Sequence, residues 1–156
     1  RKNLKSPDIL FLMITISEIT ECTTETLNAV NRLLPQLSAS AKPISMDRLL
    51  QLTESDSTML FLGADQGGEI VGMLSLIVMQ IPTGNKAWIE DVVVDQSARG
   101  KGIGRALMNH ALEEAKKYGV KSIDLTSRPS RKSANELYQS LGYEIRETNV
   151  YRYKIS

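Results

Sequence analysis

The residues with the clearest chemical potential form a short turn that follows an apolar run. The run is Val92-Val93-Val94, and the turn is Arg99-Gly100-Lys101-Gly102-Ile103-Gly104-Arg105, with glycine at three alternate positions. Glycine lets a backbone approach a ligand closely and turn several N–H groups to one side. A helix that begins directly after the turn adds unpaired N–H donors and a partial positive charge. Together with the basic side chains, the segment predicts a site for a phosphate-bearing ligand.

The spacing of the glycines narrows the kind of phosphate ligand. A P-loop needs Lys-Ser or Lys-Thr after its last glycine, and neither follows here. The dinucleotide pattern G-x-G-x-x-G fails, because a count from Gly100 reaches Arg105 where the third glycine should stand. Asp124 does lie at about the right distance to imitate the ribose-binding acid of that fold. A dinucleotide site and a glycine-rich connection without a ligand therefore stay as alternatives.

The spacing that fits is R-x-x-G-x-G, formed by Arg99, Gly102 and Gly104. With this motif the sequence resembles the GNAT superfamily of N-acetyltransferases, whose members use Q/R-x-x-G-x-G/A to hold the pyrophosphate of coenzyme A. The resemblance extends back through residues 88–95 and forward through residues 133–138 and 141–143. Three motifs in this order are a far more specific signal than the glycine turn alone.

The resemblance implies acetyl-coenzyme A as co-substrate and direct attack by a primary amine in a ternary complex. The strand at Val92–Val94 should splay from its neighbour and pair with the pantetheine arm, and the backbone N–H of Val92 or Val93 could face the thioester oxygen. The residues expected to bind the cofactor are Val92, Val93, Val94, Arg99, Gly100, Lys101, Gly102, Ile103, Gly104, Arg105 and Asn135.

Acetyl transfer to an amine also needs a group that removes the amine proton and one that protonates the thiolate. The resemblance implies that Tyr138 is the acid, although Tyr138 also lies beside apolar residues that mark a buried helix face. Asn135 and Tyr138 are three positions apart and share one face of the final helix. For the base we favour Glu90. Its neighbour Asp91 should point to the opposite face of the strand and help to attract a cationic acceptor.

Other reactive side chains offer weaker hypotheses. His110, the one histidine of the chain, falls two turns into the helix after the glycine turn and therefore away from its phosphate end. Cys22 lacks the paired histidine of a nucleophilic cysteine. A basic cluster at Arg128, Arg131 and Lys132 could touch the 3′-phosphate of coenzyme A or form a solvated loop.

Composition excludes several classes of protein. The chain has 156 residues and a net charge of +1, with 42% hydrophobic, 24% charged and 5% aromatic residues. These values are ordinary for one globular domain and speak against nucleic-acid binding. One cysteine and one histidine predict neither an internal disulfide nor a zinc site, so no metal is expected. No apolar run reaches the ~20 residues of a membrane span, so cytoplasm is the expected compartment.

The hydrophobic pattern predicts alternating strands and helices. Strands are expected at 13–19, 58–64, 69–81, 86–94 and 120–126, with one or two more in 143–155; helices are expected from Thr24 to about Leu37, around 46–52, at 102–118 and at 133–141. Thr24 is the expected N-cap of the first helix, and Pro35 should disturb its end. This order predicts a GNAT-like α/β fold with a mixed, mostly antiparallel central sheet and helices on both faces.

One domain is expected over residues 13–156, preceded by an N-terminal extension of residues 1–12 that an upstream addition would explain. The function expected is acetyl transfer to a small-molecule or peptide amine, without nucleic-acid or membrane partners and with a homodimer as one form of assembly. The alternative is a non-catalytic acyl-coenzyme A sensor. It would keep Arg99, Gly102 and Gly104 but would need neither Tyr138 nor Glu90.

Overall fold

The structure, a computed structural model, describes residues 14–156. The expected extension of residues 1–12, and Met13 with it, lie outside the described residues. The described chain forms two compact units that meet between Thr126 and Ser127. The first unit contains the sheet and most of the helices, the second contains the last helix and the C-terminal segment, and each is described by itself.

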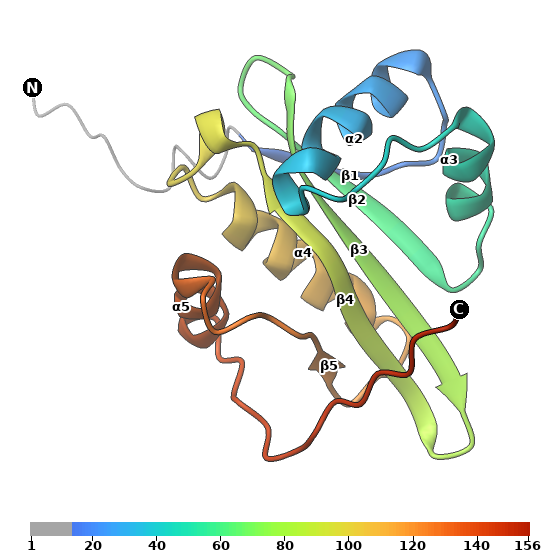
Figure 1. Ribbon diagram of the computed structural model, residues 1–156, viewed down its shortest axis with the longest axis vertical. Helices are drawn as coiled ribbons and strands as arrows, with labels where there is room; N and C mark the ends of the chain where they lie inside the picture. The colour runs from blue at the N-terminus through green and yellow to red at the C-terminus, as the bar shows by residue number, and fades with distance from the viewer. Residues whose placement is uncertain (1–13) are drawn as a thin grey trace, which may run out of the picture. The chain divides into compact units, whose positions relative to one another are not determined.

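The first unit is built on one mixed sheet (Figure 1). Its strands, in spatial and chain order, are β1 (Thr15–Glu18), β2 (Thr58–Ala64), β3 (Ile70–Ile81), β4 (Gly84–Val94) and β5 (Ile123–Asp124). The first four pair antiparallel, and β5 pairs parallel to β4. The predicted mixed, mostly antiparallel sheet is confirmed.

Two helices cover one face of this sheet, α2 (Thr24–Leu37) and α3 (Met46–Thr53). Both are amphipathic and turn their apolar residues inward. Leu33 of α2 and Leu49 of α3 are fully buried in one cluster with Leu62 of β2 and Met73 of β3. The cluster also includes Val93 of β4, and therefore fixes α2 against the strand that leads into the glycine turn.

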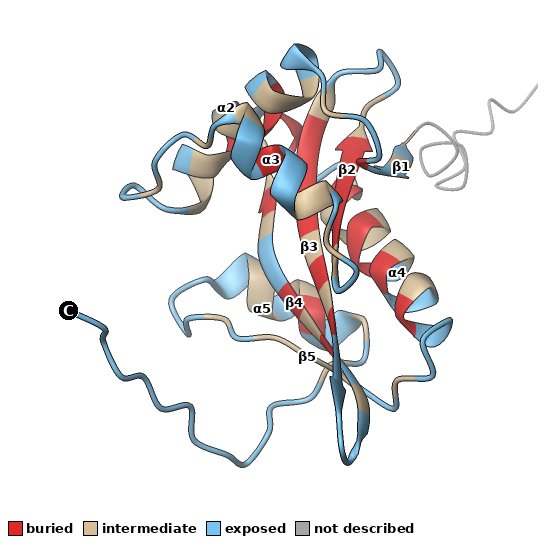
Figure 2. Cartoon of the chain, turned by 90° about the vertical axis from the view of Figure 1, so that its right-hand side faces the viewer, coloured by how far each residue is buried: buried red, intermediate tan, exposed pale blue. Residues whose placement is uncertain are grey.

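The opposite face carries α4 (Ile103–Lys116), which follows the glycine turn directly. Figure 2 shows its buried stripe against the strands. The helix approaches closely because Gly63 and Gly72 have no side chains: a Cβ on Gly72 would lie 3.0 Å from both Ile103 Cγ2 and Leu107 Cδ1. The first two turns of α4 are thereby seated on the sheet, and with them the start of the helix. Helices on both faces are confirmed.

The start of α2 differs from the prediction by one residue. Thr23, not Thr24, is the N-cap: its backbone is extended, and its hydroxyl accepts the N–H of Thr26 at 3.1 Å. Two adjacent threonines can each serve as a cap, and the sequence does not rank them. Pro35 lies inside the helix, which ends two residues later at Leu37. The missing N–H of Pro35 therefore affects only the last turn.

The second unit, residues 127–156, contains α5 (Lys132–Ser140) but no strand. The prediction of one or two strands in 143–155 is wrong, and β5 is shorter than the predicted 120–126. Residues after Gly142 alternate between apolar and polar, yet Ile145, Tyr151 and Tyr153 are largely exposed. Alternation is a property of the sequence, whereas a strand also needs a hydrogen-bonded neighbour, and the segment lacks one.

Candidate active site

A β-bulge interrupts β4 just before the glycine turn. Glu90 pairs with Ser75 and Val93 pairs with Met73, so that Asp91 and Val92 together lie opposite the single residue Leu74. Asp91 has φ 51°, and within residues 14–156 it is the one non-glycine residue with positive φ. Such a bulge leaves one residue out of the ladder and bends the strand. The backbone at 91–92 is therefore not committed to β3 as the rest of the strand is.

The other edge of β4 also loses its partner along this stretch. β5 pairs with β4 only at Ala87 and Trp88. Beyond Trp88, the backbone groups of β4 that point toward β5 take part in no strand ladder up to Val94. An extended ligand could pair with these groups as an added strand would.

The two carboxylates of this strand have different surroundings. Glu90 is exposed and accepts a hydrogen bond from Trp88 Nε1 at 2.8 Å. Its partner Ser75 lies across the ladder from it, on the same face as Met73 and therefore on the side of α2 and α3. Asp91 is also exposed as a residue, but its carboxylate in the bulge is partly desolvated, and this desolvation and then the charge of Glu90 raise its pKa above the ordinary value. A raised pKa favours proton uptake nearer to neutral pH.

The glycine turn joins β4 to α4 through a short 3-10 helix, η1 (Gln96–Ala98). Gly100 and Gly102 have φ values of 75° and 84°, a left-handed conformation that favours glycine. Gly102 is the N-cap of α4 and offers no capping side chain. The N–H of Ala106 donates to Gly102 O at 3.0 Å. Helix geometry leaves the N–H groups of Ile103 and Gly104, at the start of α4, without a carbonyl partner inside the helix.

Basic side chains surround these donors. Arg99 is exposed and donates from Nε to Val94 O at 3.3 Å, which holds its side chain along the turn. Lys101 is also exposed, and Arg105 lies in the first turn of α4. A Cβ on Gly100 would meet no atom of the described residues within 4 Å. Open backbone, unpaired N–H donors and cationic side chains fit a pyrophosphate group.

The predicted residues of α5 lie in the second unit. Asn135 donates from Nδ2 to both Arg128 O and Arg131 O at 2.9 Å, and so closes the loop that carries the basic cluster. Tyr138 is buried, and this burial raises its pKa, with Arg131 acting weakly in the opposite direction. The phenol therefore keeps its proton at neutral pH. Asn135 and Tyr138 belong to the second unit, whereas the glycine turn, Glu90 and Asp91 belong to the first.

Tyr143 is a neighbour of Tyr138 for which no role was predicted. The two rings lie 6.2 Å apart between centroids. The Tyr143 hydroxyl is buried without a hydrogen-bond partner in the described structure, and burial raises its pKa. Its position after Leu141-Gly142 was visible in the sequence, but nothing there distinguished it from a packing residue.

His110 and Cys22, the two reactive residues with weaker functional hypotheses, make packing contacts in the structure. His110 packs edge-on against Phe61, with ring centroids 4.8 Å apart at 75°. Cys22 Sγ lies 3.4 Å from Thr53 Oγ1. Among residues 14–156, no group of three or more His, Cys, Asp or Glu side chains could hold a metal ion. None of the helices in the described part combines the length and hydropathy needed to cross a membrane.

Residues 26–143 match the family model for the acetyltransferase (GNAT) family. This range is most of the chain, and the chain therefore belongs to the acetyltransferase (GNAT) family. The N-acetyltransferase YhdJ of Bacillus subtilis is 30% identical over 108 residues, which are 69% of this chain and 75% of that protein. The [Ribosomal protein bS18]-alanine N-acetyltransferase of Escherichia coli is 37% identical over 59 residues, 38% of this chain and 40% of that enzyme.

Solved structures agree with the family assignment. A transcriptional regulator from Bacillus halodurans has a TM-score of 0.78 at 27% identity, over 90% of this chain and 99% of that one. Among the first curated relatives, the matched share of the relative's own length runs from 27% to 75%. The resemblance to GNAT enzymes is confirmed for family and fold.

Proposed function

We propose that this chain transfers the acetyl group of acetyl-coenzyme A to a primary amine by direct attack in a ternary complex. The observation that carries the proposal is the junction of β4 and α4. There, a strand with a bulge and an unpaired edge runs into a left-handed glycine turn with open N–H donors. The first feature suits an extended pantetheine arm, and the second suits the pyrophosphate next to it.

The cofactor contacts follow from that junction. The backbone of Val92, Val93 and Val94 would pair with the pantetheine amides. The N–H of Val92 or Val93, beside the bulge, would donate to the thioester oxygen as negative charge develops there. The pyrophosphate would accept hydrogen bonds from the turn and the first residues of α4, and Arg99 and Lys101 would supply opposite charge. Asn135 would support the loop that carries the second basic cluster.

The proton that leaves the amine requires a base on β4. Glu90 stands on the side of α2 and α3, but its carboxylate already accepts a hydrogen bond from Trp88. Asp91 has the raised pKa that suits a base near neutral pH. We therefore propose that the pair acts together: one carboxylate takes the proton, directly or through a water, and the other attracts the cationic acceptor.

Tyr138 would complete the reaction as the acid. As the amine nitrogen forms its bond to the carbonyl carbon, the carbon–sulfur bond breaks, and the sulfur receives the phenolic proton. The amine proton on the carboxylate returns to solvent, and the phenol is reprotonated from water. A phenol is protonated at neutral pH, and burial raises the pKa of Tyr138 further, so the proton is present when the thiolate leaves.

The acceptor class rests on the relatives and on charge. The relatives include a ribosomal-protein alanine N-acetyltransferase, an aminoalkylphosphonate N-acetyltransferase and a glucosamine 6-phosphate N-acetyltransferase. These relatives all act on amines. For this chain we propose a small-molecule or peptide primary amine, because the adjacent Glu90 and Asp91 favour a cationic group.

The test of the acid role uses Tyr138→Phe, with Tyr143→Phe as the matched control that also loses a buried hydroxyl from the second unit. Thiol release from acetyl-coenzyme A would be followed with a panel of primary amines. Tyr138→Phe should lower kcat by about 10²-fold or more and leave binding of acetyl-coenzyme A nearly unchanged. Equal kcat in the wild type and in Tyr138→Phe would remove Tyr138 from the mechanism. Binding without turnover on any amine would favour the acyl-coenzyme A sensor.

The base is tested by comparing Glu90→Gln with Asp91→Asn. The variant that lacks the base should lose the acidic limb of the kcat/KM profile, because no group is left to lose its proton as pH rises. The other variant should keep that limb and raise KM for the amine. Retention of the limb in both single variants and in the double variant would exclude both carboxylates.

A further inference from the structure

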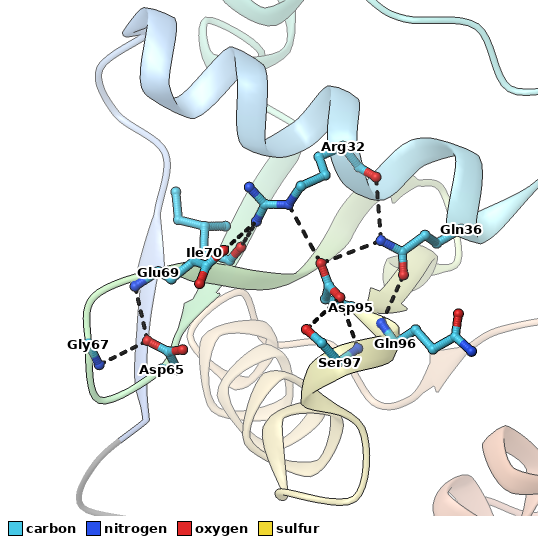
Figure 3. Close-up of polar contacts among 9 residues, drawn as sticks. All are labelled: Arg32, Gln36, Asp65, Gly67, Glu69, Ile70, Asp95, Gln96 and Ser97. Atoms are coloured by element: carbon cyan, nitrogen blue, oxygen red, sulfur yellow. Dashed lines mark hydrogen bonds and ion pairs between the residues drawn. The ribbon is translucent and has the colours of Figure 1, made fainter.

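Two side chains of α2 contact the connection between β4 and α4, although they lie far from it in sequence. Arg32 and Gln36 are one helical turn apart and point toward the same segment (Figure 3). Gln36 and Gln96 are separated by 60 positions, yet Gln36 Oε1 accepts the backbone N–H of Gln96 at 2.8 Å. Arg32 Nε lies 3.5 Å from Asp95 Oδ2. Helix α2 is thus tied to the segment that leads from β4 into the glycine turn.

Asp95 is the point where these contacts meet. Its Oδ1 accepts hydrogen bonds from the backbone N–H and the hydroxyl of Ser97, at 3.0 and 2.9 Å. Its Oδ2 faces Arg32 and lies 3.4 Å from Gln36 Nε2. The Asp95 backbone donates to Val71 O at 2.7 Å, which ties the same residue to β3. The Asp95 carboxylate therefore caps η1 and also contacts Arg32 and Gln36 of α2.

The far side of Arg32 is anchored as well. Its guanidinium donates to the backbone carbonyl of Ile70 at the start of β3 and lies 3.8 Å from the Glu69 carboxylate. Asp65 holds the same hairpin, because its Oδ1 accepts the N–H groups of Gly67 and Glu69. The Arg32 side chain therefore spans from the β2–β3 hairpin to Asp95, as Figure 3 shows.

These contacts affect the N–H groups that would bind phosphate, because few residues separate Asp95 and Gln96 from those groups. Only residues 99–102 lie between the end of η1 and the first residue of α4. The other end of that stretch is seated on the sheet by Ile103. A shift of Asp95 or Gln96 must therefore be taken up by the turn itself, where Gly100 and Gly102 offer the softest backbone.

We infer that Gln36 and Arg32 are positioning residues for the phosphate turn, so that the affinity for the cofactor depends on α2. The inference rests on the proposed function, because it takes the turn to bind the pyrophosphate of acetyl-coenzyme A. Neither side chain needs to touch the ligand. Both act by fixing Asp95 and Gln96, and thereby the directions of the N–H groups that follow.

The experiment compares Gln36→Ala and Arg32→Ala with Gln51→Ala and Arg48→Ala. The control pair lies on α3 and forms its own side-chain hydrogen bond at 3.4 Å, away from the turn. Calorimetric titration with acetyl-coenzyme A should show Kd raised roughly two- to tenfold for each α2 variant, the effect of one lost hydrogen bond. The controls should bind like the wild type. Arg32→Lys, which keeps the charge, should recover part of the loss.

Two further readouts separate positioning from a general loss of structure. KM for acetyl-coenzyme A should rise in the α2 variants while kcat at saturation stays within about twofold of the wild type, because positioning of the turn acts on binding. Amide hydrogen exchange in the free protein should speed up over residues 96–105 in Gln36→Ala but not in Gln51→Ala.

The outcomes distinguish this inference from the proposed function. Wild-type binding with unchanged Kd and unchanged exchange in both α2 variants would overturn the inference and leave the proposed function standing. Failure of the wild type to bind acetyl-coenzyme A would overturn both the proposed function and the inference that rests on it. Faster exchange in Gln36→Ala would then show that α2 holds a turn with a different purpose.

Discussion

The glycine turn allows a single methyl group to test whether its backbone conformation binds the cofactor. Gly102 has φ 84°, and among residues 14–156 a Cβ there would meet only Ile14 Cδ1, at 4.0 Å, an ordinary contact. Gly102→Ala therefore introduces backbone strain without a steric clash. The cost of a left-handed conformation for alanine is about 1–2 kcal/mol. For a domain of this size, that cost corresponds to a fall in Tm of roughly 2–8 °C.

The same change should have a larger effect on binding than on folding. Relief of the strain rotates the backbone at the N-cap of α4 and redirects the N–H groups after it. Loss of one hydrogen bond to a charged phosphate oxygen costs about 1.5–3 kcal/mol. We therefore expect Kd for acetyl-coenzyme A to rise roughly ten- to a hundredfold in Gly102→Ala.

Gly119→Ala is the matched control, because Gly119 follows the opposite end of the same helix. Its φ is 65°, and a Cβ there would meet no atom within 4 Å. Both variants should lose similar stability in thermal unfolding, but only Gly102→Ala should bind acetyl-coenzyme A weakly in calorimetry. Wild-type affinity in Gly102→Ala, or an equal loss in Gly119→Ala, would refute the role of the turn conformation.

Three further predictions follow from packing, pH and charge. Gly72→Ala should lower the free energy of unfolding by about 1–2 kcal/mol, because its Cβ would crowd Ile103 and Leu107. The control Gly67→Ala, in an open turn, should change the free energy of unfolding by less than about 0.5 kcal/mol. The pKa of Asp95 is lowered in the fold, chiefly by hydrogen bonds from Ser97, so its carboxylate stabilises the protein above its unfolded pKa. Urea unfolding should show that the difference in free energy of unfolding between the wild type and Asp95→Asn is constant from pH 7 to 5 and shrinks as pH falls below about 4. A difference that stays the same at every pH would contradict this. Lys101→Ala should weaken acetyl-coenzyme A binding and flatten its dependence on salt concentration, and an unchanged salt slope would count against its contact with phosphate.

Local patterns in the sequence predicted the parts of the fold that depend on neighbouring residues. β2 spans the predicted residues 58–64, and α4 begins within one residue of its predicted start after the glycine turn. The two glycines with positive φ could be expected because only glycine adopts that conformation at little cost. These features follow from propensity and spacing alone.

The bulge in β4 could not be predicted in the same way. Simple alternation puts Glu90 and Asp91 on opposite faces, and nothing in the residue types signals that Asp91 takes a positive φ. The bulge depends on how β3 and β4 are registered, because Ser75 and Met73 must both find partners across the ladder. Register is a tertiary property, which a single strand does not encode.

Two other features were not predicted because they also depend on tertiary structure. The alternating segment after Tyr143 suggested strands, but pairing requires a partner that the pattern does not identify. The contacts of Arg32 and Gln36 with Asp95 and Gln96 arise only when segments some sixty positions apart are brought together. The sequence thus predicted the glycine turn but not the side chains that hold it.

The central claim is that the β4–α4 junction binds acetyl-coenzyme A. The most direct measurement is calorimetric titration of acetyl-coenzyme A into the purified wild-type protein, with NAD and ATP as controls. The account predicts one binding site per chain for acetyl-coenzyme A and none for NAD or ATP. Absence of binding in a folded sample, or equal binding of NAD or ATP, would contradict it and remove the basis for the roles proposed for Glu90, Asp91 and Tyr138.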